Sequence, residues 1–178
     1  FLLTLANGLL GRTLIELLPA VSGRVLGGDA TTLATLSAAA GAGSILGGLL
    51  VSRQSGRLPL LARIVLAALA TSALLLLSAS LWQSLPVVSA AVLLAALCTT
   101  TIGTGCQALT QLMVDERYRG RIMSLWTVIA MGTPAVGTVL VGVGADTLGF
   151  PPALAVTAAL ALLVLARVGR PLLQRVAA

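Results

Sequence analysis

The sequence predicts an all-α integral membrane protein with six transmembrane helices, arranged as two inverted three-helix repeats. Hydrophobic residues make up 58% of the 178 residues, charged residues make up 9%, and the mean hydropathy is +1.07. Soluble domains carry about 25% charged residues. The apolar runs are continuous rather than alternating, and each approaches the roughly 20 residues that a spanning helix needs. An apolar glycine-rich stretch, a short turn and a proline-led helix start occur twice, at residues 44–63 and 138–155.

Six spans account for nearly the whole chain. The first three form one predicted repeat, residues 1–81, and the last three form the other, residues 86–170. A basic tail covers residues 167–178. The predicted spans are Leu2–Leu26, Thr32–Ser52, Leu60–Leu81, Val87–Met113, Ile122–Ala145 and Ala153–Val168.

The arginines between the spans predict the orientation. All eleven basic residues are arginines, and Arg12 alone lies well inside a span. One side carries Arg53, Arg57, Arg63, Arg117, Arg119, Arg121, Arg167, Arg170 and Arg175, against Arg24 on the other. Because basic loops stay inside, both termini of this segment are expected in the cytoplasm and the protein in the inner (plasma) membrane. Phe1 opens within an apolar stretch that does not resemble a signal peptide, so we expect a fragment or one half of a longer chain.

The first span carries an ionisable pair. Arg12 and Glu16 are four residues apart, so one helix face presents both side chains. Charged groups at that depth need a partner or a water-filled cavity. Two interpretations remain open: a self-neutralising structural pair, or a substrate or proton site in which Arg12 tunes the pKa of Glu16. Pro19, about a turn further on, predicts a helix bend.

The second span carries small residues on one face. Gly43 and Gly47 form a GxxxG pair, Ser44 and Gly48 repeat the spacing, and Ala39 extends the stripe. Such stripes allow two helices to approach closely. This pattern indicates helix packing, and it is also compatible with helices that slide in a transporter.

Polar residues follow one face of the fourth span. The spacing i, i+4, i+7, i+11 predicts a single polar stripe that faces either a substrate pathway or another helix. This stripe consists of Thr100, Thr104, Gln107 and Gln111, widened by Thr101 and Thr110.

The fifth span is predicted to contain a bend or a close contact at Gly132, Thr133, Pro134 and Gly137. Trp126 is interpreted as an interfacial anchor, and Asp146 as a solvated helix end.

Several classes of function are excluded by missing residue types. The chain has no Walker loop and no histidine, and Cys98 and Cys106 both lie inside an apolar span. We therefore expect no enzyme activity, no metal site, no cofactor and no disulfide. The arginines lie between apolar spans with almost no aromatic neighbours, which does not indicate nucleic-acid binding.

Two turns resemble those of the major facilitator superfamily. In that superfamily the loop between the second and third helices of each half reads Gly, three residues, Asp, Arg, one residue, Gly, then basic residues. Gly48, Arg53, Gly56 and Arg57 match this pattern, Ser52 replaces the Asp, and one extra residue precedes Gly56. The segment VDERYRGRIMSLW, residues 114–126, is similar to the start of the eleventh helix in exporters resembling enterobactin-exporter and macrolide-efflux proteins.

The resemblance implies the C-terminal half of a twelve-helix secondary transporter. Its implied function is proton-coupled export of drugs, siderophores or other small molecules, with the basic turn as a cytoplasmic gate. Its implied partners are membrane lipid, a small-molecule substrate and an N-terminal six-helix half. The alternatives are a six-helix scaffold or assembly module that does not transport, and a homodimeric half-transporter.

Overall fold

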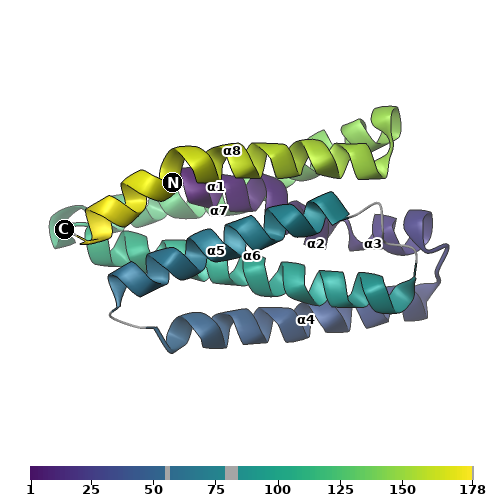
Figure 1. The fold of residues 1–178 in the computed structure, drawn as a ribbon, viewed down its shortest axis with the longest axis horizontal. Helices are drawn as coiled ribbons and strands as arrows, with labels where there is room; N and C mark the ends of the chain where they lie inside the picture. Colours follow the sequence, from purple (N-terminus) through teal and green to yellow (C-terminus); the bar gives the residue numbers. More distant parts are fainter. Residues whose placement is uncertain (55–56, 79–83, 178) are drawn as a thin grey trace.

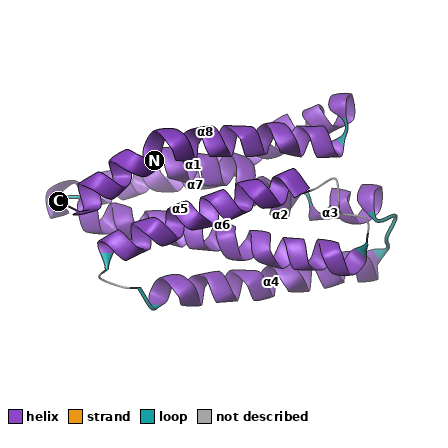
Figure 2. Ribbon diagram, viewed as in Figure 1, coloured by secondary structure: helices purple, strands orange, loops and turns teal. Residues whose placement is uncertain are grey.

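The computed structural model describes residues 1–54, 57–78 and 84–177, and within these ranges it contains helices and turns but no strand (Figure 2). Among the described residues, five helices, α4 to α8, are long and apolar enough to cross a membrane. They are α4 (Ala30–Ser52), α5 (Leu58–Leu77), α6 (Leu85–Met113), α7 (Glu116–Leu148) and α8 (Phe150–Ala177). An all-helical membrane protein is therefore confirmed, whereas six spans in two inverted repeats remain a prediction.

The first predicted span is a series of short helices rather than one regular helix. It consists of α1 (Leu2–Ala6), the π-helix η1 (Asn7–Arg12), α2 (Thr13–Glu16), α3 (Leu18–Ala20) and the π-helix η2 (Val21–Val25). The α-helix is interrupted at Leu17, whose φ of −88° and ψ of 9° are not helical, two residues before Pro19. A proline cannot donate a backbone hydrogen bond and restricts the residue before it, which favours an interruption at this point.

Helix ends explain where the structure departs from the predicted boundaries. Helix α7 begins at Glu116 rather than Ile122 because the carboxylate of Asp115 accepts a hydrogen bond from the backbone N–H of Arg117 at 2.9 Å. Its charged first turns are therefore helical, although hydropathy places them outside the membrane. Helix α8 likewise continues through the predicted tail to Ala177.

The start of α4 is fixed by Asp29. Its carboxylate accepts hydrogen bonds from the backbone N–H groups of Thr31 and Thr32, both at 3.0 Å. The backbone hydrogen bond from Thr32, together with that residue's hydroxyl, lowers the pKa of this carboxylate. Gly27, with a φ of +57°, makes the preceding turn in a conformation that other residues rarely adopt.

The helices lie side by side, with α6 packed against both α4 and α5 and with α5 packed against α8 (Figure 1). Helix α7 and the first segment lie next to each other, and α8 lies beside both. The α4–α5 turn, the α6–α7 turn and the C-terminus lie toward one end of the bundle in Figure 1. The arginine-rich turns of the sequence are therefore grouped at one end of the fold.

The contact between α4 and α6 is made by glycines. Gly43 and Gly47 are buried, and a methyl group on either would meet the backbone carbonyl oxygen of Leu93 or Leu97 on α6. The GxxxG prediction is confirmed at these two positions. Gly48 is different, because nothing lies within 4 Å of the place where its side chain would be.

Candidate functional site

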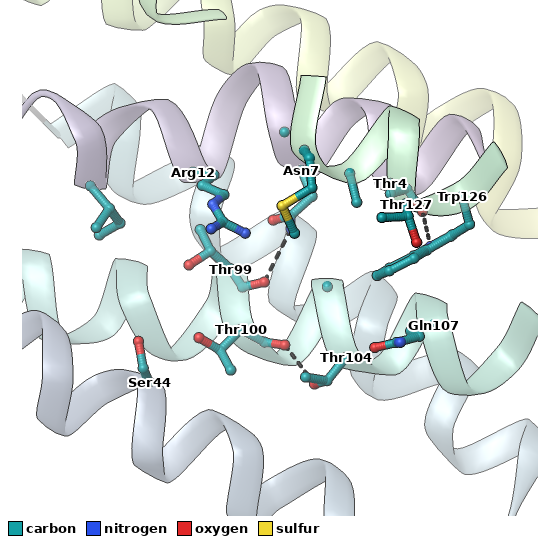
Figure 3. Close-up of a pocket in the computed structure, with 15 residues that line it drawn as sticks. Thr4, Asn7, Arg12, Ser44, Thr99, Thr100, Thr104, Gln107, Trp126 and Thr127 are labelled. Carbon is teal, nitrogen blue, oxygen red and sulfur yellow. Dashed lines mark hydrogen bonds between the residues drawn. The ribbon is translucent and has the colours of Figure 1, made fainter. Parts of the chain in front are cut away.

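A polar cavity of about 560 Å³ lies between the first segment, α6 and α7, with α4 contributing Ser44 (Figure 3). Three of the predicted stripe residues of α6, namely Thr100, Thr104 and Gln107, line it together with Arg12. The fourth stripe residue, Gln111, is exposed near the end of α6 and is not among the residues that line the cavity. The periodicity of α6 thus predicted most of the wall that this helix contributes to the cavity.

Arg12 and Glu16 are close in space, and Thr138 extends the group. Arg12 Nε lies 3.8 Å from Glu16 Oε1, and the Thr138 hydroxyl donates a hydrogen bond of 2.9 Å to Glu16 Oε2. The two charged side chains are 51% and 40% exposed, so the pair is not buried within this chain. Arg12 lines the cavity, whereas Glu16 is not among the lining residues and links the first segment to α7.

The π-helix η1 brings Asn7 and Arg12 to the same cavity. Residues five apart in an α-helix point about 140° away from each other, at 100° per residue. In η1 the hydrogen bonds run from residue i to residue i+5, so these two positions stack along one face. Sequence reasoning missed Asn7 because, in the regular α-helix expected there, its side chain would point away from that of Arg12.

Asn7 also connects the first segment to α6. Its side chain is 7% exposed, and Nδ2 donates a hydrogen bond of 3.1 Å to the backbone carbonyl of Thr99. The Oδ1 atom is buried and has no hydrogen-bond partner in the described part of the chain. An acceptor of this kind is normally completed by water or by a polar group from elsewhere, and this one adjoins a polar cavity.

Trp126 forms one end of the cavity rather than a membrane anchor. It is 8% exposed, and its indole N–H donates a hydrogen bond of 3.1 Å to the Thr4 hydroxyl, which is itself buried (Figure 3). The interfacial interpretation of Trp126 is therefore wrong. A residue 122 positions away determines its placement, and no local pattern carries that information.

The indole–hydroxyl bond gives a testable energy. Removing the indole N–H by Trp126→Phe is expected to destabilise the protein by about 1 kcal/mol for the lost hydrogen bond, plus the cost of a smaller ring. Thr4→Val removes the other partner. Because the two changes break the same bond, the double variant should lose less than the sum of the single losses. Thermal unfolding of the purified full-length protein measures this, and strictly additive losses would contradict a direct bond.

The predicted bend residues of α7 contact the first segment. Helix α7 continues through Pro134, which is buried, and the Pro134 carbonyl, 2.9 Å from the Thr138 hydroxyl, is an alternative acceptor for the proton that this hydroxyl can donate to Glu16. Gly137 faces the first segment so closely that a methyl group there would meet the Thr13 hydroxyl and lie 2.7 Å from the Leu9 carbonyl oxygen. Gly132 is exposed with nothing within 4 Å. Close packing against the first segment thus explains the glycine at position 137 but not the one at position 132.

The predicted gate residues lie away from the cavity. Arg53 and Arg57 are exposed on either side of the α4–α5 turn, and Gly48 lies one turn before the end of α4. Gly56 lies outside the described residues. Their grouping near one end of the bundle separates them from the polar cavity.

A second cavity, of about 440 Å³, is lined by apolar residues of the first segment, α7 and α8. Among the described residues that line it, Thr157 alone has a side chain with a hydrogen-bonding group. Cys98 and Cys106 are buried as free thiols, and no cluster of metal-binding side chains occurs within the described residues. The polar cavity is therefore the candidate site.

Comparison with known proteins agrees with this picture. A family model described as "Transmembrane secretion effector", from the major facilitator group, matches residues 2–177. No curated protein and no solved structure matches the chain.

Proposed function

Since this chain belongs to the transmembrane secretion effector family of the major facilitator superfamily, we propose that it is one half of a proton-coupled exporter of small molecules. Members of this superfamily are membrane transporters rather than enzymes. The observation that carries the proposal is the polar cavity between the first segment, α6 and α7. A cavity lined by an arginine, hydroxyls and an amide inside an apolar helix bundle costs stability unless it receives something polar.

In this proposal the chain forms the C-terminal wall of the transport pathway. An N-terminal six-helix half supplies the opposite wall, and the two halves rock about the substrate. The arginine-rich end of the bundle faces the cytoplasm, in keeping with the positive-inside rule. Arg53 and Arg57, at a helix end and in the following turn, act as the cytoplasmic gate, where cations interact favourably with a helix C-terminus.

A single cysteine-labelling experiment tests both orientation and alternating access. Thr104→Cys places a thiol in the cavity wall, while Ala30→Cys and Tyr118→Cys, both at exposed positions, mark the two ends of the bundle. Background labelling from this segment should be low because its native cysteines are 2% and 5% exposed. In the full-length protein, an impermeant thiol reagent should label Ala30→Cys only from outside and Tyr118→Cys only from inside. Thr104→Cys should react from either side, and a pH gradient should shift its reactivity between them.

Some outcomes of the same experiment would contradict the proposal. Labelling of Tyr118→Cys from outside in intact cells would overturn the orientation. A scaffold or assembly module predicts that Thr104→Cys reacts from one side at most. Arg57→Ala should raise the cytoplasmic labelling rate of Thr104→Cys, and an unchanged rate would remove the gate assignment.

A further inference from the structure

The charge of the cavity is set by one side chain. Among the described residues that line it, Arg12 alone is ionisable, and its guanidinium points into the cavity (Figure 3). Its ion pair with Glu16 is made by Nε, 3.8 Å from Oε1, and the other Glu16 oxygen accepts a hydrogen bond from Thr138 of α7. Neither Nη group has a hydrogen bond or an ion pair with the described residues, so both are available to a ligand, in the planar fork that suits carboxylate, sulfonate or phosphate oxygens.

The opposite wall is polar but neutral. Thr100, Thr104 and Gln107 come from α6, and the Thr104 hydroxyl donates to the Thr100 carbonyl at 2.6 Å. Within the described residues no carboxylate lines the cavity. A cationic ligand would thus find no opposite charge on this wall and would lie beside a guanidinium, which is unfavourable for a charge leaving water.

The other end of the cavity contains an aromatic ring and apolar side chains, together with Thr127, whose hydroxyl donates to the Met123 carbonyl at 3.0 Å. Because the indole N–H of Trp126 is taken by Thr4, the ring offers mainly its apolar surface, next to Ala130 and Met131. Thr4, which holds the indole, and Arg12 are eight residues apart on one segment, so their backbone positions are about 12 Å apart along the helix axis. This spacing matches a small molecule with a charged group and a ring system.

We propose that the substrate recognised at this wall is an amphiphilic small anion, with its acidic group on Arg12 and its apolar part on Trp126. This inference rests on the proposed function, since it names the substrate class of the same cavity. It distinguishes this wall from one that binds lipophilic cations, for which a carboxylate in the place of Arg12 would be favourable.

The experiment compares two probes that share a xanthene ring frame and differ in charge. Fluorescein is an anion and rhodamine 123 is a cation. Each is tested for protection of Thr104→Cys against a maleimide reagent in membranes containing the full-length protein. Fluorescein is expected to protect at a concentration about tenfold or more below that of rhodamine 123.

Substitutions at Arg12 test the contact itself. Arg12→Gln should raise the half-protecting concentration of fluorescein about tenfold or more, and Arg12→Lys, which keeps charge but not the fork, should raise it less. Arg63→Gln is the matched control, because it removes an exposed arginine of α5 that does not line the cavity. If Arg12→Gln cannot be recovered in a folded form, the Arg12→Lys variant provides the test. A half-protecting concentration of fluorescein equal to that of the wild type would rule out a contact with the guanidinium fork.

The outcomes separate this inference from the proposed function. Equal or better protection by rhodamine 123, or no protection by fluorescein, overturns the anionic class. If Thr104→Cys still reacts from both membrane sides in that case, alternating access stands and only the substrate class is wrong. If the protein that carries Thr104→Cys as its single substitution does not react from both sides of the membrane, the transport proposal itself is wrong.

Discussion

Gly47→Leu is expected to prevent most of the protein from accumulating in a folded form. A Cβ atom at this position would lie 2.5 Å from the Leu97 carbonyl oxygen and 3.2 Å from the side chains of Thr100 and Thr101. A carbonyl inside α6 cannot move away without displacing the helix, so α4 must separate from α6. Overpacking of this kind costs about 1–3 kcal/mol, and more where backbone is displaced.

The matched control is Gly41→Leu on the same helix. Gly41 is exposed and has nothing within 4 Å of its Cβ position, so a side chain there projects away from the protein. Both changes give the same gain in helix propensity, about 1 kcal/mol, so their difference isolates the helix contact. Yield of monodisperse protein and the melting temperature provide the comparison. Equal melting temperatures for the two variants would show that α4 and α6 are not in contact as described.

Glu16→Gln is expected to abolish proton-driven accumulation of substrate while leaving the protein folded. The two side chains of the Arg12–Glu16 pair are 51% and 40% exposed within this chain, so Glu16→Gln does not leave Arg12 in a closed apolar site. The substituted glutamine still offers an oxygen to the Thr138 hydroxyl. What it loses is the ability to bind and release a proton, which is the role that we propose for Glu16.

The measurement uses proteoliposomes of the full-length protein and radiolabelled fluorescein. Accumulation driven by a pH gradient should disappear, whereas exchange without a gradient should continue. Glu116→Gln is the control, because Glu116 forms a comparable pair with Arg119 at 3.7 Å on an exposed helix start. Should Glu16→Gln be stable and still accumulate fluorescein against a gradient, Glu16 does not couple transport to protons. A large fall in melting temperature would point instead to the structural interpretation of the pair.

The regular helices were the part of the fold that composition and periodicity could predict. Helix α6 keeps a period of 3.6 over its length, so the spacing of Thr100, Thr104 and Gln107 translated directly into one face of a cavity. The α4 stripe behaved in the same way, because the small size of Gly43 and Gly47 permits close approach whichever helix is the partner. In both cases the relevant information is local.

The first segment could not be predicted because its geometry depends on distant contacts. A π-helix replaces the expected α-helix where Asn7 reaches the Thr99 carbonyl and where Gly8 packs closely against Thr133 of α7. The sequence around Asn7 does not indicate which hydrogen-bonding pattern these partners favour. The burial of Trp126 could not be predicted either. Its position in the sequence suggests the membrane interface, whereas its burial depends on the hydrogen bond to the distant Thr4 hydroxyl.

The unequal lengths of the helices determine how the bundle can sit in a lipid bilayer. Helix α5, with 20 residues, is about 30 Å long and matches the hydrocarbon thickness, whereas α7, with 33 residues, is about 50 Å long. The excess must be absorbed by tilt or by protrusion into the headgroup layer. Protrusion at the arginine-bearing start of α7 would bring Arg117, Arg119 and Arg121 to the level of the lipid phosphates. Anionic headgroups would attract these side chains, so the lipid composition of the membrane influences the depth at which α7 is held.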